Sequence, residues 1–385
     1  MIHPGSNAWI GVLGGGQLGR MLALAARPMG YKILTWTGGD RSGAADVADE
    51  VMHQPFDDPE ALEKFCAQVE VATAEFENLP GEMLRQVEER VPLRPNSNSI
   101  ITSQHREREK KFLSDHGFGC ARHFIVTNAE ELKNGVRSIG RDCILKTAEF
   151  GYDGKGQQKI AGDLSDEEIE NLWQSFDSNR AVLEERVELD TELSVLVARG
   201  TEGEVVTYDP AENLHRNHIL DLSIIPASLP ENILEEARKT AVGVAEALDY
   251  IGILAVEFFL SKAGRLLVNE IAPRPHNSGH HTIDGCMTSQ FQQQARAICG
   301  LPLGSTALKK PCAMLNLLGD VWAAENTPPD WGPIFNTPGA TLHLYGKAGA
   351  RAGRKMGHAN FLADDLETVL AQVAICREAY GMPAV

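Results

Sequence analysis

Two glutamates stand in apolar segments that are predicted to face each other across a hairpin. Glu257 lies in the run Ala255–Leu260 and Glu270 in the run Leu266–Ile271, with a tight Ser-Lys-Ala-Gly turn between the two. Directly opposed like charges destabilise a sheet, so either one carboxylate is protonated or paired with arginine, or a divalent cation lies between them. Mg²⁺ takes one or two carboxylates together with phosphate oxygens. The pair favours a magnesium–phosphate site, with Asn269 as a further ligand or contact.

A lysine in a predicted strand stands shortly before a glycine-rich loop. Lys146 lies in the apolar run Cys143–Thr147, and the loop reads GYDGKGQ over Gly151–Gln157. A lysine in a buried strand needs an anionic partner, and glycines let the backbone approach a phosphate closely while Lys155 adds charge. It is not a Walker A loop, because no Gly-Lys-Ser or Gly-Lys-Thr opens a helix. Either it is a flexible hairpin tip or, with the two glutamates, it completes an ATP site without a P-loop.

Three glycines, Gly14, Gly16 and Gly19, form a G-x-G-x-x-G pattern between a predicted strand and a predicted helix. A dinucleotide fingerprint also needs an acidic residue at the end of the second strand, where it binds the ribose. That position holds Thr37, and the nearest acid, Asp40, lies beyond two glycines, which disfavours NAD. The alternatives are a tight strand-to-helix turn and a helix N-terminus that faces another anionic ligand.

A histidine-rich loop follows the second glutamate strand. His276 and His280 have a spacing that suits zinc, but Pro273 and Pro275 indicate a loop, and no third ligand of zinc type is nearby. The planar guanidinium of Arg274 suits a carboxylate or phosphate instead. We therefore expect this loop to converge on an anion rather than on zinc.

Five basic residues, Lys347, Arg351, Arg354, Lys355 and His358, gather towards the end of the chain. Such a run is usually a solvated face. The chain as a whole has 36 Lys and Arg against 53 Asp and Glu, a formal net charge of −17, so a local basic pocket also suits a small phosphorylated substrate. The same acidic balance is a poor match for nucleic acids and anionic membranes.

The composition is that of a globular chain. Hydrophobic residues make up 43% and charged residues 23% of the 385 residues, which excludes a disordered chain and leaves room for two or three domains. The longest apolar stretches, such as Ile251–Leu260, fall well short of the ~20 residues of a membrane helix, and the start MIHPGSNAW lacks the basic region of a signal peptide. Seven cysteines without a C-x-x-C pair favour free thiols in a reducing cytoplasm.

Alternating strands and helices are predicted to position these residues. Ala8–Leu13 and Tyr31–Trp36 are strands on either side of a helix over Gln17–Arg27, which implies a parallel sheet with right-handed crossovers. A linker at Leu93–Ser99 then leads to a charged helix over Ser103–His116. Short strands around one amphipathic helix follow, and a small β-containing domain with a closing helix ends the chain. The predicted fold class combines α/β and α+β.

Several long motifs in a fixed order resemble the ATP-grasp superfamily, and within it the N5-carboxyaminoimidazole ribonucleotide synthetases of purine biosynthesis. The resemblance runs from Gly14 to about His358, and several motifs in order are far more specific than any one of them. The motifs are GGGQLGRML at Gly14–Leu22, TAEFENLP at Thr73–Pro80, GYDGKGQ at Gly151–Gln157, NEIAPRPHNSGH at Asn269–His280 and YGK…GRKMGH at Tyr345–His358.

The resemblance implies a Rossmann-like preATP-grasp domain over residues 1–102, an ATP-grasp domain over 103–300 with a lid at about 121–190, and a small C-terminal domain over 301–385. It implies an ATP-dependent carbon–nitrogen ligase that uses Mg²⁺ and phosphorylates bicarbonate to carboxyphosphate. The exocyclic amine of 5-aminoimidazole ribonucleotide then captures the carboxyl group, or CO₂ released beside it, and ADP and phosphate leave. It further implies a cytoplasmic homodimer that binds small molecules and neither nucleic acid nor membrane.

Site residues follow from the resemblance, position by position. The implied ATP contacts are Arg106, Lys146, Gly151, Tyr152, Asp153, Gly154, Lys155, Gly156, Gln157, Glu184, Glu185, Arg186, Val187, Glu192, His215, Asn269 and Glu270. The implied contacts to bicarbonate and the aminoimidazole nucleotide are Gln17, Leu18, Glu75, Tyr152, Lys155, Arg274, His276, Asn277, Ser278, Lys347, Arg354 and Lys355. The residues implied to act in catalysis are Tyr152, Asp153, Arg274 and Lys355, and those implied to bind Mg²⁺ are Glu257 and Glu270.

Three other functions stay open. An ATP-grasp ligase that uses formate or another carboxylate would share the fold, and bicarbonate-dependent phosphate release would separate the two. A NAD-dependent oxidoreductase is disfavoured by Thr37. A non-catalytic nucleotide-binding regulator is disfavoured by the intact set of Lys146, Glu257, Glu270 and Arg274.

Overall fold

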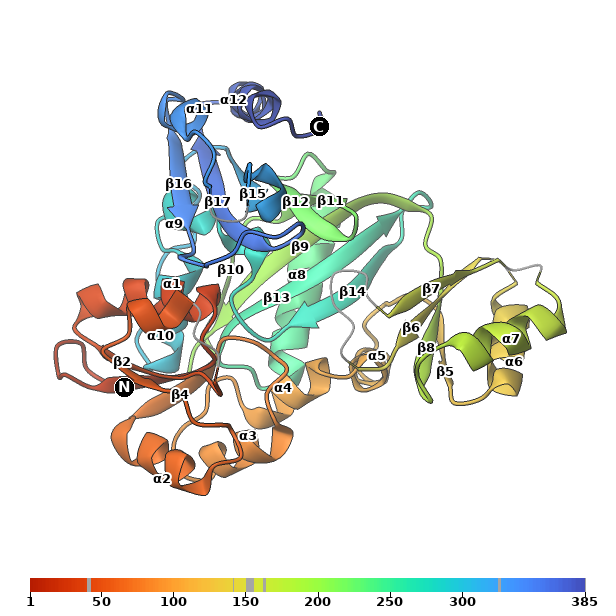
Figure 1. Cartoon of the computed structure of the whole chain (residues 1–385), viewed down its shortest axis with the longest axis horizontal. Coiled ribbons are helices and arrows are strands. Elements are labelled where there is room, and N and C mark those ends of the chain that lie inside the picture. Colours follow the sequence, from red (N-terminus) through yellow and green to blue (C-terminus); the bar gives the residue numbers. More distant parts are fainter. Residues whose placement is uncertain (40–42, 141, 150–155, 162–163, 325–326, 385) are drawn as a thin grey trace.

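The computed structural model describes residues 1–39, 43–140, 142–149, 156–161, 164–324 and 327–384. The chain forms an N-terminal α/β lobe, a small lobe of strands and helices, and a long central sheet that continues into the C-terminal lobe (Figure 1). None of the described helices is long and apolar enough to cross a lipid bilayer.

The N-terminal lobe contains a parallel sheet in the order β3-β2-β1-β4. Strands β1, β2 and β4 are almost fully buried because helices cover both faces of the sheet. The two predicted strands and the helix between them are confirmed, each within one residue of its predicted ends. The elements are β1 (Trp9–Leu13), α1 (Gln17–Ala26), β2 (Lys32–Trp36), β3 (Glu50–Met52), α2 (Pro59–Gln68), β4 (Val71–Ala74), α3 (Gly81–Glu88) and α4 (Ser97–Ser103), with short 3₁₀ turns at Arg27–Met29 and Gly43–Asp46.

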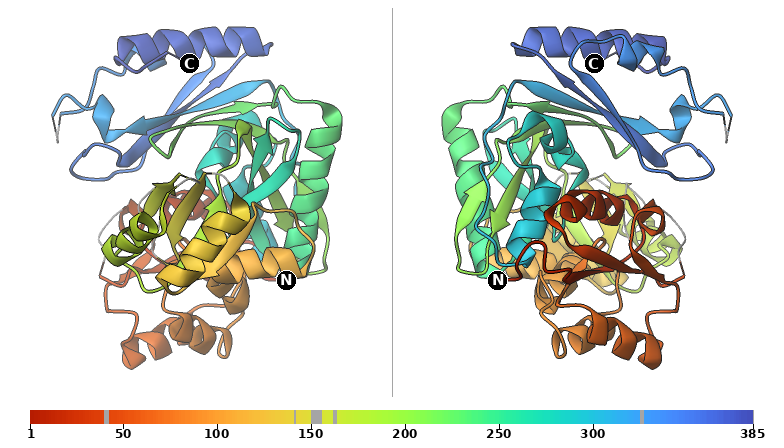
Figure 2. Two further views of the ribbon diagram at one scale, coloured as in Figure 1. Left: turned by 90° about the vertical axis from the view of Figure 1, so that its right-hand side faces the viewer. Right: turned by 90° about the vertical axis from the view of Figure 1, so that its left-hand side faces the viewer.

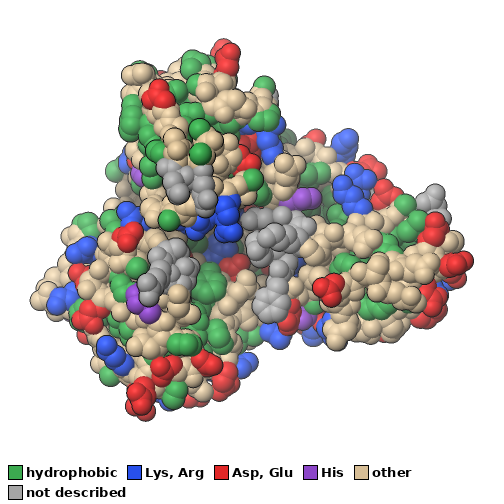
Figure 3. All heavy atoms as spheres, in the orientation of Figure 1, with side chains coloured by type: hydrophobic (Ala, Val, Ile, Leu, Met, Phe, Trp, Pro, Cys, Tyr) green, Lys and Arg blue, Asp and Glu red, His purple; other side chains and the backbone are tan. Residues whose placement is uncertain are grey.

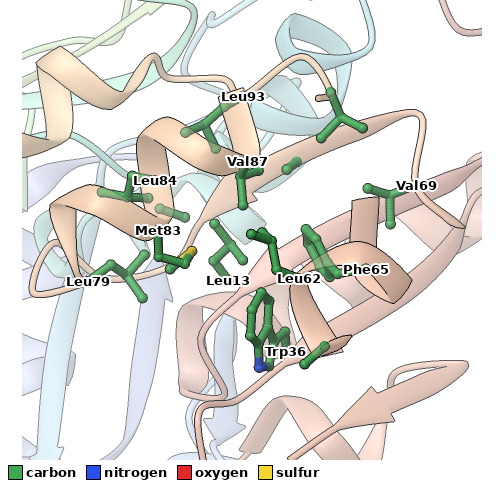
Figure 4. Packing of buried hydrophobic residues seen from close by; sticks show 14 of the residues in the cluster. Leu13, Trp36, Leu62, Phe65, Val69, Leu79, Met83, Leu84, Val87 and Leu93 are labelled. Carbon is green, nitrogen blue, oxygen red and sulfur yellow. The ribbon is translucent and has the colours of Figure 1, made fainter. Parts of the chain in front are cut away.

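One face of this sheet packs against α2 and α3 (Figure 4). The ring centroids of Trp36 and Phe65 lie 5.5 Å apart in this core. Phe65 packs so closely on β1 that a Cβ at Gly11 would lie 2.4 Å from a ring carbon of Phe65. The other face packs on α1, and Phe291 of the central region joins that cluster. The N-terminal lobe is thereby fixed against the rest of the chain.

The segment after this lobe differs from the prediction. Leu93 forms a bridge with β4, and the side chain of Asn96 caps α4 by accepting a hydrogen bond from Ser99 N at 2.8 Å. The segment Leu93–Ser99, predicted to be a linker, therefore begins with a residue that pairs with the sheet and continues into the N-terminal cap and first turn of α4. The charged helix predicted over Ser103–His116 is α5 (Arg106–Asp115). It begins three residues later than predicted, because Ser103 ends α4 and His105 has extended backbone.

The small lobe, here called the lid, is an antiparallel sheet in the order β5-β8-β6-β7. Its helices cover one face and bury Leu145 and Leu183. Because side chains alternate along a strand, Lys146 and Glu184 emerge on the opposite face. The elements are β5 (His123–Val126), α6 (Ala129–Ile139), β6 (Cys143–Thr147), β7 (Gln157–Ile160), α7 (Asp166–Ser175) and β8 (Ala181–Glu185).

The central sheet has nine strands in the order β14-β13-β9-β11-β12-β15-β17-β16, with β10 paired on β9. The predicted hairpin of β13 and β14 is confirmed, and α8 packs on this end of the sheet. The C-terminal strands continue the same sheet through the pairing of β12 with β15, and α12 packs across them (Figure 2). The elements are α5 (Arg106–Asp115), β9 (Leu189–Arg199), β10 (Val205–Thr207), β11 (Ala211–Arg216), β12 (Ile219–Ile225), α8 (Glu231–Ala247), β13 (Gly252–Ser261), β14 (Leu266–Ala272), α9 (Thr282–Gly285), α10 (Gln290–Ile298), β15 (Cys312–Leu318), α11 (Gly332–Phe335), β16 (Ala340–Leu344), β17 (Lys355–Leu362) and α12 (Leu366–Ala379), with 3₁₀ turns at Asn277–Gly279 and Gly319–Val321.

Candidate active site

A cleft with a volume of about 1620 Å³ lies between the lid, the central sheet and the N-terminal lobe. Lys and Arg side chains gather around this hollow (Figure 3). The lid sheet lines one wall, and strands β9, β13 and β14 line another. The rest of the lining comes from α5, the end of α4, the β11–β12 hairpin, the loops after β4 and β14, and the start of β17. The predicted site residues that line the cleft are Arg106, Lys146, Gln157, Glu184, Glu185, Arg186, Val187, Glu192, His215, Glu257, Asn269, Glu270, Arg274, His276, Asn277 and Lys355.

Glu257 and Glu270 are direct partners in the antiparallel pairing of β13 with β14, as predicted. Glu257 is buried, whereas Glu270 is exposed to the cleft. Burial and the neighbouring Glu270 carboxylate raise the pKa of Glu257 to about 8. His276 Nε2 lies 3.1 Å from Glu257 Oε1, but burial, Arg274 and Lys355 hold the pKa of His276 well below its usual range. This imidazole therefore adds no positive charge beside the two carboxyl groups.

The carboxylate pair fits a divalent cation by its chemistry. The two carboxyl groups face each other, and the raised pKa of Glu257 shows that they do not both ionise readily near neutral pH. A bound cation would let both ionise, and Asn269 lines the cleft beside them. Among the described residues, no group of three or more His, Cys, Asp or Glu side chains is arranged to hold a metal ion. Phosphate and water oxygens would therefore complete the shell of an ion held by Glu257 and Glu270, as is usual for Mg²⁺.

On the lid wall, Glu184 is a buried carboxylate with two lysine partners. Its Oε2 lies 2.9 Å from Lys146 Nζ and its Oε1 lies 3.9 Å from Lys110 Nζ. Burial alone would raise the pKa of Glu184, but Lys110 and Lys146 outweigh burial and hold the pKa at about 2. Lys146 therefore has its anionic partner within the protein while it also lines the cleft.

Glu192 on β9 and His215 on β11 form an ion pair of 3.0 Å on the cleft wall. Burial lowers the pKa of His215, but the hydrogen bond to Glu192 and the nearby Glu257 outweigh it, so that the pKa is raised overall. The pair places a hydrogen-bond donor and an acceptor together beside the cleft.

The guanidinium of Arg274 is held by a carboxylate that the sequence reasoning missed. Glu77 accepts from Nε at 2.5 Å and from Nη2 at 3.2 Å, a bidentate arrangement. Burial opposes the charge of Arg274, but Glu77 outweighs it and raises the pKa of the guanidinium. The anion that the loop converges on is thus the protein's own, and both residues line the cleft.

The loop after β14 presents a polar side chain that lacks a partner. Asn277 is buried and lines the cleft, yet neither its Oδ1 nor its Nδ2 has a hydrogen-bond partner among the described residues. Such a group is costly unless a ligand or water satisfies it. Ser278 next to it lies outside the cleft lining, where it contacts Ser194 Oγ at 2.8 Å and His276 Nδ1 at 2.9 Å.

The first glycine motif already holds an anion. The carboxylate of Glu75 accepts hydrogen bonds from Gly16 N at 2.8 Å and Gly19 N at 3.3 Å, at the N-terminus of α1. A Cβ at Gly16 would lie 2.7 Å from Glu75 Oε1, so glycine is needed for this approach. Burial raises the pKa of Glu75, while the backbone N–H groups and Arg274 oppose that rise. The helix N-terminus that predicts a phosphate or NAD site therefore binds a protein carboxylate.

The basic residues near the end of the chain, here called the basic tail (Lys347, Arg351, Arg354, Lys355 and His358), do not all face the cleft. Lys355 lines the cleft, whereas the guanidinium of Arg354 donates to the carbonyl oxygens of Ala348 and Gly349. Lys347 Nζ donates to Lys355 O at 3.0 Å. The two neighbours, Arg354 and Lys355, thus differ in their surroundings: only Lys355 lines the cleft.

Several predicted residues lie elsewhere or outside the described residues. The residues that do not line the cleft are Gln17, Leu18, Glu75, Gly156, Ser278, Lys347 and Arg354. Those outside the described residues are Gly151, Tyr152, Asp153, Gly154 and Lys155. The cleft residues that the sequence reasoning missed include Glu77, Glu109 and Lys110; the i, i+3, i+4 spacing of Arg106 with Glu109 and Lys110 is a signal that could have found the last two.

Comparisons with known proteins agree with this geometry. Family models match along the chain: a ribonucleotide synthetase preATP-grasp domain over residues 8–104, an ATP-grasp domain over 111–291 and a phosphoribosylaminoimidazole carboxylase C-terminal domain over 312–372. The N5-carboxyaminoimidazole ribonucleotide synthase of Bacillus subtilis is 42% identical over 94% of this chain and 93% of its own. The predicted ATP-grasp fold and resemblance are thereby confirmed.

Solved structures give the same result. The N5-carboxyaminoimidazole ribonucleotide synthetase of Thermus thermophilus is 39% identical and superposes with a TM-score of 0.88 over 96% of this chain and 98% of its own. The N5-carboxyaminoimidazole synthase of Aspergillus clavatus, in complex with ADP and 5-aminoimidazole ribonucleotide, is 29% identical with a TM-score of 0.87 over 97% and 99%. The chain belongs to the N5-carboxyaminoimidazole ribonucleotide synthase family of ATP-grasp ligases.

Proposed function

We propose that this chain catalyses the ATP-dependent carboxylation of 5-aminoimidazole ribonucleotide by bicarbonate, as a carbon–nitrogen ligase of purine biosynthesis. The observation that carries the proposal is one continuous cleft that combines a carboxylate pair and Lys146 with Arg274, Asn277 and Lys355. That composition suits a metal-bound triphosphate beside a small anionic substrate. The names of the relatives state this activity, and one solved relative holds both ADP and the aminoimidazole nucleotide.

In the proposed reaction the chain first orients ATP. Lys146 and Arg106 line the cleft where they can pair with phosphate oxygens, and the backbone of residues 184–187 offers hinge groups for adenine. Glu192 would take the ribose hydroxyls, with His215 beside it. Mg²⁺ held by the glutamate pair would neutralise phosphate charge when bound.

A bicarbonate oxygen then attacks the γ-phosphorus, which gives carboxyphosphate and ADP. The exocyclic amine attacks the carboxyl carbon, or CO₂ released beside it; the C–N bond forms, phosphate leaves with the electron pair of the C–O bond, and the nitrogen loses a proton. We assign the anions of this sequence to Arg274, His276, Asn277, Ser278 and Lys355. The further proposed substrate contacts are Gln17, Leu18, Glu75, Tyr152, Asp153, Lys155, Lys347 and Arg354, of which Arg354 should contribute least because its guanidinium donates to Ala348 and Gly349.

Release of inorganic phosphate, with each substrate omitted in turn, tests the proposal. We expect rapid release only with ATP, bicarbonate and the aminoimidazole nucleotide together, and N5-carboxyaminoimidazole ribonucleotide as product. Formate and acetate at the same concentration serve as controls. Release that follows formate or another carboxylate, and not bicarbonate, would assign the chain to a different ATP-grasp activity.

We also propose a homodimer in a reducing cytoplasm, with domains over residues 1–102, 103–300 (lid at about 121–190) and 301–385. None of the seven cysteines forms a disulfide, which supports a reducing compartment. The dimer rests on the resemblance alone, and light scattering of the purified chain measures its mass directly.

A further inference from the structure

The strand that carries Glu270 lies at the edge of the central sheet. An edge strand exposes backbone N–H and C=O groups that have no neighbouring strand. On the inner side, the register of β14 with β13 shifts, so that Glu257 faces Glu270 and Phe258 faces Val268. Asn269 is the extra residue of this bulge. On the outer side, Val268 bridges to Cys120 and its N–H donates to Gly119 O at 2.7 Å. From Asn269 to Ile271 no described strand pairs with this outer side, so the backbone beside Glu270 is irregular on one side and lacks a neighbouring strand on the other.

Two consecutive side chains of α5 bind this backbone on either side of Glu270. Lys110 Nζ donates to Asn269 O at 2.8 Å, and Ile271 N donates to Glu109 Oε1 at 2.7 Å. Both side chains are buried, with exposures of 1% for Lys110 and 5% for Glu109. Together they replace the missing neighbour strand at the residues that flank the glutamate.

The same lysine also reaches the lid. Lys110 Nζ lies 3.9 Å from Glu184 Oε1, and Glu184 Oε2 lies 2.9 Å from Lys146 Nζ. One chain of contacts thus runs from the backbone beside Glu270, through α5, to the lysine on the lid wall. It joins the two walls between which the nucleotide is proposed to bind.

Packing alone does not explain this pair. Leu113 of α5 already supplies fully buried apolar contact with the central core, and burying charged groups costs free energy that an apolar pair would avoid. The charged pair adds directional hydrogen bonds, each of which fixes the position of one backbone group. The backbone groups fixed are those immediately before and after Glu270.

We propose that Glu109 and Lys110 are positioning residues that hold Glu270 opposite Glu257 and so determine the affinity for a metal-bound nucleotide; the proposal rests on the nucleotide site proposed above. The hydrogen-bonding capacity of residue 109 is what matters, not its charge. Lys110 has the additional role of coupling that backbone to Glu184.

Calorimetric titration with Mn²⁺·ADP tests the proposal without any turnover. We expect Glu109→Gln, which keeps an acceptor oxygen, to bind Mn²⁺·ADP within about threefold of the wild type, and Glu109→Met to bind about tenfold more weakly, since one hydrogen bond to an irregular backbone segment is lost. Lys110→Met should weaken binding by about tenfold or more. Lys111→Met, the same change at the adjacent exposed lysine that pairs only with Asp115 among the contacts described, is the matched control and should bind as the wild type does.

Equal binding by Glu109→Gln and Glu109→Met, whether both normal or both weakened, would overturn the positioning role. If Lys110→Met does not fold, the two Glu109 variants still decide. A second readout separates positioning from general damage: the KM for the aminoimidazole nucleotide should stay within about twofold in the Glu109 and Lys110 variants. A wild type that binds Mn²⁺·ADP but does not carboxylate would refute the proposed function and leave this test intact; one that does not bind Mn²⁺·ADP would overturn the positioning role itself.

Discussion

Two buried carboxylates in the same cleft have opposite electrostatic surroundings. Glu184 on the lid wall lies between Lys110 and Lys146, and its pKa is about 2. Glu257 on the wall of the central sheet faces Glu270 and a histidine that carries no charge near neutral pH, and its pKa is about 8. Both carboxylates are buried to a similar degree, so burial does not separate them.

The difference lies in what supplies the positive charge. On the lid wall the protein neutralises its own carboxylate, which leaves Lys146 held in place before any ligand arrives. On the other wall Glu257 keeps its proton near neutral pH, and a cation that comes with the ligand would let both carboxyl groups ionise. Environments that push the pKa values of neighbouring groups far apart are typical of catalytic sites.

The largest expected effect concerns Glu270, on the wall where two carboxyl groups face each other. Glu270→Ala should lower turnover by about a thousandfold or more, because the metal contributes several kcal/mol of charge stabilisation at the phosphates. The fold should persist, since Glu270 is exposed to the cleft and is not part of the buried core. Phosphate release and thermal unfolding of the same preparation measure the two effects. Wild-type activity in this variant would remove the metal assignment.

On the lid wall, a change at Glu184 should instead lower the free energy of unfolding. The folded-state pKa of Glu184, about 2, lies below the ordinary value of 4.5, so its contribution is present above pH 4.5 and is lost as the pH falls towards 2. Glu184→Gln should cost about 3 kcal/mol of unfolding free energy at pH 7. Urea unfolding between pH 7 and pH 3 should show the gap between variant and wild type closing; a gap independent of pH would mean that the ion pairs do not hold Glu184.

Lys146→Met sharpens the comparison from the ligand side. It should raise the dissociation constant for ATP by about tenfold to a hundredfold, as the loss of a charge-assisted contact to phosphate does, and leave the aminoimidazole nucleotide nearly unaffected. Calorimetric titration with each ligand decides. Equal losses for both ligands would mean that Lys146 acts through the lid as a whole.

The smallest effect concerns the basic tail. Lys355→Ala should raise the KM for the aminoimidazole nucleotide by about tenfold, because a charged contact to a group that does not react contributes mainly uniform binding. Arg354→Ala should change it by less than about threefold, since Arg354 donates to Ala348 and Gly349 instead. Steady-state kinetics at saturating bicarbonate compare the two. A larger loss for Arg354 than for Lys355 would reverse our assignment of the pocket.

Strand patterns predict one wall of this site well. Glu257 and Glu270 are found because hairpin register follows from turn length, and Lys146 because an apolar strand makes a lysine conspicuous. Their pairing in the structure is the one predicted. Ligand roles for the residues around them came from the resemblance rather than from spacing.

Other features depend on contacts between distant segments. Charged residues on α5 are typical of a solvated face, and only the edge of β14 beside them reveals why Glu109 and Lys110 are buried. The glycine motif predicts an anion at α1, but local sequence cannot show that Glu75 supplies it. Continuity of the sheet into the C-terminal lobe depends on the pairing of β12 with β15, which no local pattern encodes.

The most direct test of the proposed cation site at Glu257 and Glu270 is the effect of Mg²⁺ on ADP binding. Calorimetric titration of ADP into the wild type, with and without Mg²⁺, should show binding about tenfold or more tighter with the metal. We expect Glu257→Gln and Glu270→Gln to bind metal-free ADP as the wild type does and to lose that gain. The same gain from Mg²⁺ in all three proteins would contradict the central claim that Glu257 and Glu270 bind a cation that comes with the ligand.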